Sequence, residues 1–334
     1  MSSGVSDCSV PLQISDAKII FLMALINPGN FPRPSTRAFL KEARQTRGFS
    51  LIDLLHGYIY NRWLYLYIGI GIGEHPLARL IHPVARFFNW LLSSESDQDP
   101  DRVSFADTYH GKVVTLEAAR QLVTVNEEIR LHDLEQVIPY AHARDIILKN
   151  PDHIVVLECP CRTSRPDPCL PLDVCLIVGE PFAGFVIEHH PRRARWITSE
   201  EADEILKSEH SRGHVHHAFF KDAMFGRFYA ICNCCSCCCG AMHSMRNGTP
   251  MLAASGYMSR VEVDLCIGCN VCVENCPFGA LELREDVVEV DHAMCMGCGV
   301  CVSTCEVGAL SLVRDQSASE PLEIRHLMAQ ARCS

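Results

Sequence analysis

The sequence predicts an α+β protein of three consecutive units, and three observations lead to that prediction. A duplicated cysteine pattern fills residues 259–314, and a second cysteine-rich region with both strand and helix patterns fills residues 101–258. Residues 1–92 are apolar and basic and have helical periodicity, and residues 315–334 form a C-terminal tail. At 334 residues the chain is long enough for two or three domains.

The chain carries 20 cysteines, a net charge of −10 and 48% hydrophobic residues. Its first residues lack the basic, apolar character of an export signal, so we expect the cysteines in a reducing cytoplasm, where clustered thiols indicate metal binding. Cys8 and Cys333 lie outside every cluster and are expected to be spectators. Peripheral contact with the inner face of the cytoplasmic membrane is an open alternative for the location.

The N-terminal unit has a surplus of positive charge. Residues 16–92 hold nine Lys or Arg against four Asp or Glu, a difference of +5, which leaves −15 for the rest of the chain. We expect a helix that is capped by Ser35 or Thr36 and exposes Arg37, Lys41 and Arg44. The basic charge predicts docking to anionic lipid or to an acidic partner subunit, whereas nucleic acid is not expected because no binding motif occurs.

Residues 49–92 are rich in apolar side chains. The uncharged run at 63–73 is eleven residues long, too short for a bilayer, which needs about twenty. Residues 77–92 have the spacing of an amphipathic helix, with Leu80 and Phe87 on its apolar face. This helix either packs on the protein's own core, which we favour, or contacts a membrane or a partner subunit. A polar, acidic linker at 93–100 marks the domain boundary.

Local patterns in the middle unit predict alternating strands and helices. The expected helices lie at 115–123, within 133–149, and from the capping box at Thr198 to about residue 210, before Gly213. The expected strands lie at 153–157 and 227–231, and further buried runs lie at 173–178 and 184–187. Both strands lead directly into cysteines, so the loops of this small α/β domain carry the thiols.

Ten cysteines of the middle unit form two groups: Cys159, Cys161, Cys169 and Cys175, then Cys232, Cys234, Cys235, Cys237, Cys238 and Cys239. Free thiols at this spacing would oxidise unless they bound metal. Neighbours such as Cys234 and Cys235 point in different directions, which favours two additional clusters. Three arrangements remain open. Eight thiols would complete two [4Fe–4S] cubanes and leave two thiols unused, whereas a division into five and five would suit noncubane clusters. A structural zinc ion would use four of the thiols.

Charged and imidazole side chains flank these thiols. Arg162 and Arg165 are expected to offset the charge of an anionic cluster, to bind an anionic substrate, or to form salt bridges at the surface. The histidines that could ligate metal or relay protons are His189, His190, His214, His216 and His217.

The C-terminal unit contains the spacing C-x2-C-x2-C-x3-C twice. Cys266, Cys269, Cys272 and Cys276 form the first copy, and Cys295, Cys298, Cys301 and Cys305 form the second. This spacing is typical of [4Fe–4S] clusters, and Gly268 and Gly297 let the backbone wrap closely around them. Zinc is a weak alternative here, because zinc sites usually use separate C-x2-C pairs.

The two copies resemble the bacterial two-cluster ferredoxin domain over about residues 259–313. The resemblance implies a ferredoxin-like fold with one cluster on Cys266, Cys269, Cys272 and Cys305 and the other on Cys295, Cys298, Cys301 and Cys276. Together with the upstream motifs E-C-P-C-R and I-C-N-C-C-x-C-C-C-G, residues 137–313 resemble a group of iron–sulfur proteins of anaerobes, a likeness that implies no particular reaction. Cys238-Cys239-Gly240 is similar to the noncubane cluster motif of heterodisulfide reductases, without its flanking C-x-x-C spacing.

The expected function is single-electron transfer between the C-terminal clusters and the middle ones, in a subunit or partner of a larger anaerobic and membrane-associated redox complex. One alternative is an iron–sulfur reductase with a catalytic cluster at the middle cysteines, and another is an adaptor with structural zinc. A self-contained dehydrogenase is not expected, because no phosphate-binding loop, flavin motif or catalytic triad occurs.

Overall fold

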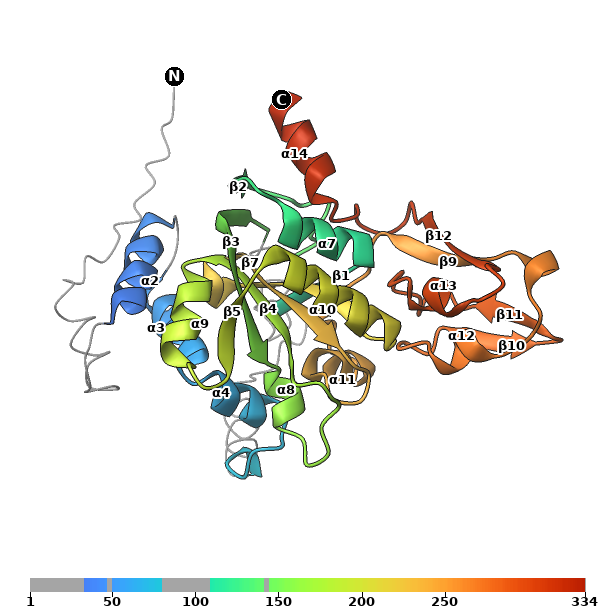
Figure 1. Ribbon diagram of the computed structural model, residues 1–334, viewed down its shortest axis with the longest axis horizontal. Helices are drawn as coiled ribbons and strands as arrows, with labels where there is room; N and C mark the ends of the chain where they lie inside the picture. Colours follow the sequence, from blue (N-terminus) through green and yellow to red (C-terminus); the bar gives the residue numbers. More distant parts are fainter. Residues whose placement is uncertain (1–32, 47–49, 80–108, 141–143, 334) are drawn as a thin grey trace, which may run out of the picture.

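The computed structural model describes residues 33–46, 50–79, 109–140 and 144–333. Within these residues an eight-stranded sheet forms the centre, helices cover both of its faces, and a smaller C-terminal domain is attached at one end (Figure 1). This mixture of helices and sheet agrees with the predicted α+β class. Most of the predicted amphipathic helix at 77–92 and the whole linker at 93–100 lie outside the described residues.

The central sheet has the strand order β2-β3-β4-β7-β6-β1-β8, and β5 pairs with β3. Neighbouring strands are antiparallel except β1 and β8, which are parallel. The strands are β1 Tyr109–Val114, β2 Ile129–Leu131, β3 Ile146–Glu158, β4 Asp173–Glu180, β5 Ala194–Ile197, β6 Val215–Lys221, β7 Arg227–Cys234 and β8 Leu252–Ala253. Every residue of β6 is buried, so its two histidines and its lysine lie inside the protein.

Two apolar cores lie on opposite faces of this sheet. The first core joins the sheet to α2 Pro34–Gln45, α3 Leu51–Arg62, α4 Leu64–Gly71, α9 Phe182–His189 and α11 Gly240–Arg246. The second core joins it to α7 Leu116–Thr124 and α10 Ser199–Ser211, which lie in front of the sheet in Figure 1, and to the start of α14 Ile324–Cys333. Six cysteines of the middle domain, Cys159, Cys161, Cys175, Cys232, Cys234 and Cys239, belong to the first core or pack against it.

Helix α2 begins differently from its prediction. Its first residue is Pro34, and Arg33 occupies the N-cap, so the prediction that Ser35 or Thr36 caps the helix is wrong. Proline is favoured at the first helical position because its missing N–H would have no helical partner there. The Ser35 N–H instead donates to the Glu188 carboxylate at 2.8 Å. The exposed side of the helix carries Arg37, Lys41 and Arg44, as predicted.

The apolar run at 63–73 forms helix α4, which directly follows α3. Leu64 and Gly69 of this helix are buried, and Leu64 joins the same core as Tyr58 and Tyr60 of α3. Within the described part of the chain, no helix combines the length and the apolar composition needed to cross a membrane.

The prediction of a helix within 133–149 is wrong. The described residues of that range form turns and then enter β3, which continues to Glu158. Ile146, Ile154 and Val155 are β-branched and fully buried, and β-branched side chains pack well on a pleated surface. The expected strand at 153–157 is therefore the last part of a much longer strand, and the run at 184–187 lies in helix α9.

Helices with clear capping signals are found where they were predicted. Thr115 caps α7 by accepting from the Ala118 N–H at 3.2 Å. Thr198 caps α10 in the same way, accepting from the Glu201 N–H at 3.2 Å. Gly213 follows α10 with φ of +78°, the left-handed conformation that glycine supplies after helices.

The C-terminal domain repeats one small unit twice. Strand β9 Tyr257–Val261 pairs with β12 Leu310–Arg314, and β10 Leu281–Arg284 pairs with β11 Val287–Val290. The short helices α12 Val271–Glu274 and α13 Val300–Thr304 each begin inside a cysteine loop. The tail then returns to the middle domain, where Leu322 and Ile324 are buried in the second core.

Candidate iron–sulfur centres

The sheet brings the ten middle cysteines together at one end of three adjacent strands. Strands β3, β4 and β7 are hydrogen-bonded neighbours, and Leu157 of β3 lies opposite Cys175 of β4. Cys159 follows β3 directly, whereas Cys232 and Cys234 lie in the last part of β7. Because β3 and β7 both run antiparallel to β4, their C-terminal ends lie beside the N-terminal end of β4.

Seven of these cysteines line one cavity, and six of them have no thiol in any other group, so we call it the six-thiol cavity. The six are Cys159, Cys161, Cys175, Cys232, Cys234 and Cys239, whereas the thiol of the seventh, Cys235, belongs to a second set. The Cys159 thiol interacts with those of Cys161 and Cys175, and the Cys232 thiol interacts with those of Cys175 and Cys234. The Sγ atoms of Cys234 and Cys239 are 3.2 Å apart. Apolar side chains, among them Leu64, Ile68 and Phe219, form much of the remaining wall.

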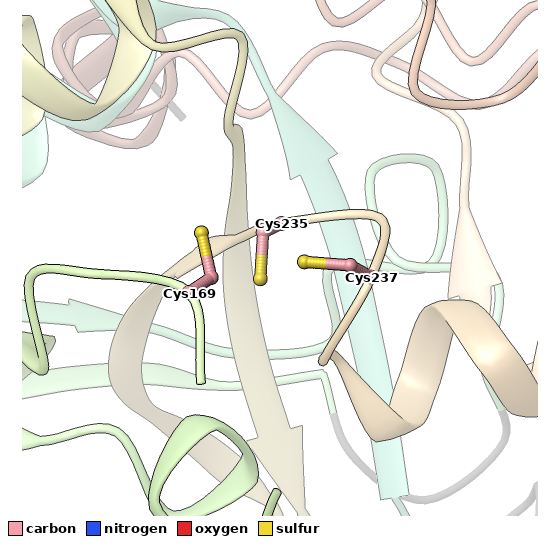
Figure 2. A group of neighbouring side chains, drawn as sticks. All are labelled: Cys169, Cys235 and Cys237. Atoms are coloured by element: carbon pink, nitrogen blue, oxygen red, sulfur yellow. The ribbon is translucent and has the colours of Figure 1, made fainter. Parts of the chain in front are cut away.

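The other four thiols form a second set nearer the surface, the four-thiol group. The sulfur atoms of Cys169, Cys235 and Cys237 all lie within 4.8 Å of one another, and Figure 2 shows that Cys169 comes from a separate loop. Cys238 joins them, because its Sγ lies 3.5 Å from Cys237 Sγ and accepts from the Cys169 N–H at 3.5 Å. Cys234 and Cys235 therefore send their thiols into different sets, as expected for neighbouring residues.

A buried ion pair lies between the two sets. Arg162 and Glu209 are each 1% exposed, and Arg162 Nη2 donates to the Glu209 carboxylate at 2.7 Å and to the Asn233 carbonyl at 3.0 Å. Burial alone would raise the pKa of Glu209, but the hydrogen bonds from His214 and Arg162 outweigh it, and the pKa is lowered. Arg162 therefore forms a salt bridge inside the protein, while Arg165 pairs with Glu74 on the surface.

The histidines divide among three places. His214 is the one next to a middle-domain thiol, with its Nε2 3.6 Å from Cys169 Sγ and its Nδ1 2.6 Å from Glu209 Oε2. His216 contacts Asn233 Oδ1 at 2.6 Å and stacks on His210 of α10, whereas His217 occupies the next position of β6, opposite Cys232 of β7. Burial lowers the pKa of His216 to about 4 and that of His217 to about 3, so both are neutral near pH 7.

His189 and His190 end helix α9 at a distance from these rings. His189 Nε2 lies 3.2 Å from Thr36 Oγ1, and His190 Nε2 donates to the Asn61 carbonyl at 2.6 Å. These contacts tie the N-terminal helices to α9. The five histidines therefore do not form one imidazole group around the thiols.

In the C-terminal domain the thiols also form two sets. Cys276 lines one small cavity together with Cys295, Cys298 and Cys301 of the other repeat. The Cys272 thiol interacts with those of Cys269 and Cys305. Burial raises the pKa of Cys298 to about 12 and that of Cys301 to about 11. Such thiols are protonated near pH 7, so metal binding there would displace their protons.

Backbone and hydroxyl donors surround these C-terminal thiols. The Ser259 N–H donates to Cys295 Sγ at 3.4 Å, and Ser259 Oγ lies 3.3 Å from Cys301 Sγ. The Ala280 N–H donates to Cys276 Sγ at 3.3 Å. Donors of this kind adjust the potential of an iron–sulfur cluster. The chemistry of the set, four thiols with hydrogen bonds to sulfur, fits a [4Fe–4S] cluster.

Arg246 at the end of α11 connects the two cysteine-rich domains. Its Nη1 donates to the Ser236 carbonyl at 2.9 Å, and its Nη2 donates to the Pro277 carbonyl at 3.2 Å. Ser236 lies between Cys235 and Cys237 of the four-thiol group, and Pro277 follows Cys276. This contact could not be predicted from the sequence, because nothing in the local pattern distinguishes Arg246 from other surface arginines.

Residues 265–320 match the family model described as the 4Fe-4S dicluster domain. This region is therefore a ferredoxin-type domain, and the chain is an iron–sulfur protein. A search among curated proteins found no match. The ten middle cysteines lie outside the matched residues, so their role is argued from their geometry.

Proposed function

We propose that the protein transfers single electrons along a series of iron–sulfur clusters that continues from the dicluster domain into the middle domain. The order would be the outer cluster on Cys266, Cys269, Cys272 and Cys305, the inner cluster on Cys295, Cys298, Cys301 and Cys276, then the four-thiol group, and last the six-thiol cavity. The observation that carries this proposal is the Arg246 contact, which joins the loop after Cys276 to the loop of the four-thiol group.

For the middle domain we propose one [4Fe–4S] cluster on Cys169, Cys235, Cys237 and Cys238, and a further cluster in the six-thiol cavity. The four-thiol group offers the number of ligands that a cubane needs. The grouping of six and four thiols argues against a division into five and five. It also argues against zinc alone, because a tetrahedral zinc site uses four ligands and would leave thiols of the six-thiol cavity without metal.

Metal analysis of anaerobically purified protein tests this assignment. Cys169→Ser combined with Cys237→Ser should remove about four irons per chain and one signal from the electron paramagnetic resonance (EPR) spectrum, because a cubane that loses two thiolates is not retained. Cys333→Ser is the matched control, since Cys333 is exposed and lies in α14, away from both sets. An unchanged iron content in the double variant, or zinc in its place, would refute the four-thiol cluster.

We further propose that the redox partner docks on the outer cluster loop. Val263, Leu265, Ile267 and Val271 form an apolar patch there, with exposures of 58%, 49%, 67% and 42%. Residues 262–291 hold eight Asp or Glu against one Arg, so acids surround the patch. A partner with an apolar centre and a basic rim would match this surface in charge and polarity.

Electron transfer to cytochrome c, a basic haem protein, provides a probe of this surface. The rate should fall as salt is added, because attraction between opposite charges guides the encounter. The double variant Asp264→Asn and Glu274→Gln should slow the reaction severalfold at low salt. The control is the double variant Glu117→Gln and Glu204→Gln, which removes two acids from the middle domain and should leave the rate unchanged. Equal effects of the two pairs would show that net charge alone matters and would refute a local docking site.

A reductase is the second candidate function, and one observation favours it. A separate pocket adjoins the six-thiol cavity, and the two spaces share Tyr60, Ile68, Cys161 and Ala241 in their walls. A ligand in that pocket would lie next to the cluster that we propose for the six-thiol cavity. Turnover of a small molecule that stops when Cys161→Ser removes one thiol would distinguish this function from simple electron transfer.

A further inference from the structure

The pocket beside the six-thiol cavity lies between helices α4 and α11. Its walls include Tyr60, Tyr67, Ile72, Lys221 and Met251. Two aromatic rings and several aliphatic side chains give it a mainly apolar lining, and Ser244 adds one hydroxyl. Ligand sites commonly combine such a lining with a small number of polar groups that fix the orientation of the ligand.

Of the described residues in the wall of this pocket, Lys221 supplies the one ionisable amino group. It comes from the buried strand β6 and is 1% exposed, and its Nζ lies 4.4 Å from the ring centre of Tyr60 and 5.2 Å from that of Tyr67. The Tyr67 hydroxyl is oriented by His56, whose Nε2 lies 2.8 Å away. Among the described residues that line the pocket there is no Asp or Glu. Burial lowers the pKa of Lys221 to about 7, so the wall is apolar and carries one amino group that a bound anion would hold in its charged form.

We infer that this pocket binds a small monocarboxylate with an aromatic or branched apolar body. The ammonium group of Lys221 would pair with the carboxylate, and the tyrosine rings and Ile72 would contact the body. A single lysine suits a monoanion better than a phosphate group, whose several oxygens and greater charge usually require more donors.

Gly71, the last residue of α4, also lines this pocket. Gly71 is exposed, and a Cβ placed on it would meet no atom within 4 Å. A larger side chain there would extend into free space without disturbing the core. Because Cys161 forms part of the wall, a bound carboxylate would lie beside the six-thiol cavity. The use of this carboxylate as a redox substrate rests on the proposed cluster in that cavity, whereas the binding of the carboxylate does not.

Calorimetric titration of the anaerobic, metal-loaded protein with benzoate and with neutral benzamide tests the inference. Benzoate should bind, and benzamide should bind at least about tenfold more weakly. Lys221→Met should weaken benzoate binding by about ten- to a hundredfold and leave benzamide binding unchanged, which also shows that the variant is folded. Gly71→Leu should abolish binding of both, whereas Leu66→Trp, on α4 outside this pocket, should not affect either.

Two results would overturn the inference. One is benzoate binding that is absent or no stronger than benzamide binding, and the other is benzoate binding that Lys221→Met and Gly71→Leu do not change. Iron content and EPR spectra of the same samples separate this question from the proposed function. If the middle-domain clusters are absent but benzoate binding still depends on Lys221, the carboxylate site is supported and the proposed electron path is refuted.

Discussion

At Gly297 the backbone of the second cysteine loop passes so close to strand β9 that no side chain fits. A Cβ at this position would lie 2.0 Å from the Tyr257 carbonyl oxygen, and φ is +62°. Gly279 has a similar φ of +66°, but a Cβ there would meet nothing within 4 Å. Substitutions at the two glycines therefore distinguish the free-energy cost of the left-handed conformation, which both share, from the cost of a steric clash, which only Gly297 has.

We expect Gly297→Ala to destabilise the protein much more than Gly279→Ala. A left-handed backbone costs a non-glycine residue about 1–3 kcal/mol, a cost that both variants share. Gly297→Ala adds the clash with Tyr257, for which overpacking typically adds about 1–3 kcal/mol, and it should impair assembly of the inner cluster. Thermal unfolding and the iron content measure both effects. Equal losses in the two variants would mean that the contact with β9 relaxes freely.

The sequence could identify the residues that belong to repeats, but not their partners from other elements. The duplicated spacing pointed to Gly297 and to each C-terminal cysteine. Ser259 contacts Cys301 from strand β9, and the repeat itself gives no signal for such a contact. His214 likewise lies beside Cys169, which is 45 residues away in the sequence, and local patterns do not encode such a long-range contact.

At the level of elements, strand β1 places a lysine inside the sheet. Lys112 is fully buried, and its Nζ donates to the Ala254 carbonyl at 3.0 Å and to Ser319 Oγ at 2.8 Å. Burial lowers the pKa of Lys112 to about 7. In the unfolded chain the lysine would titrate near pH 10.4. Between these two values the unfolded state binds the proton and the folded state does not.

Stability should therefore rise with pH above about 7. A base whose folded pKa is lowered opposes folding at low pH, and folding gains about 1.4 kcal/mol for each pH unit between its folded and unfolded pKa. We expect Lys112→Met to remove this contribution, so that its unfolding free energy rises less than that of the wild type from about pH 8 to about pH 10. Urea unfolding at several pH values measures the difference.

Lys41→Met is the control for this prediction, because Lys41 is exposed on helix α2. It should keep the pH dependence of the wild type. Cysteine ionisation affects all three proteins equally and cancels in the comparison. If Lys112→Met and the wild type gain the same stability over this range, Lys112 is charged inside the fold.

Elements with a local signature were predictable from the sequence, and buried strands were not. The helix expected at 115–123 and the one expected from the cap at Thr198 are α7 and α10, and both carry a side-chain cap, which depends on residues within one turn. Strand β3 was underestimated because its pairing with β4 and β5 comes from distant segments and because its burial does not follow a strict alternation. Strand order likewise depends on pairings that no local pattern encodes.

For the molecule as a whole, the grouping of the ten middle thiols depends on tertiary structure. The sequence showed four cysteines and then six, but the spatial sets mix them. Cys169 from the first group joins three from the second, and Cys239 returns to the six-thiol cavity although Cys237 and Cys238 do not. This mixing follows from the antiparallel arrangement of β3, β4 and β7, which brings the two cysteine motifs to the same end of the sheet.

The proposed electron path gives the last prediction, which concerns the contact between the two domains. Arg246→Met removes two hydrogen bonds to carbonyl groups, each worth about 1–3 kcal/mol because the donor is charged. We expect unchanged iron content, faster hydrogen exchange in the loops at 235–239 and 276–280, and slower equilibration of electrons between the domains after flash reduction. Arg284→Met, which removes an exposed pair within β10, should change none of these. Unaltered electron equilibration in a loosened Arg246→Met protein would mean that electrons enter the middle domain by another route.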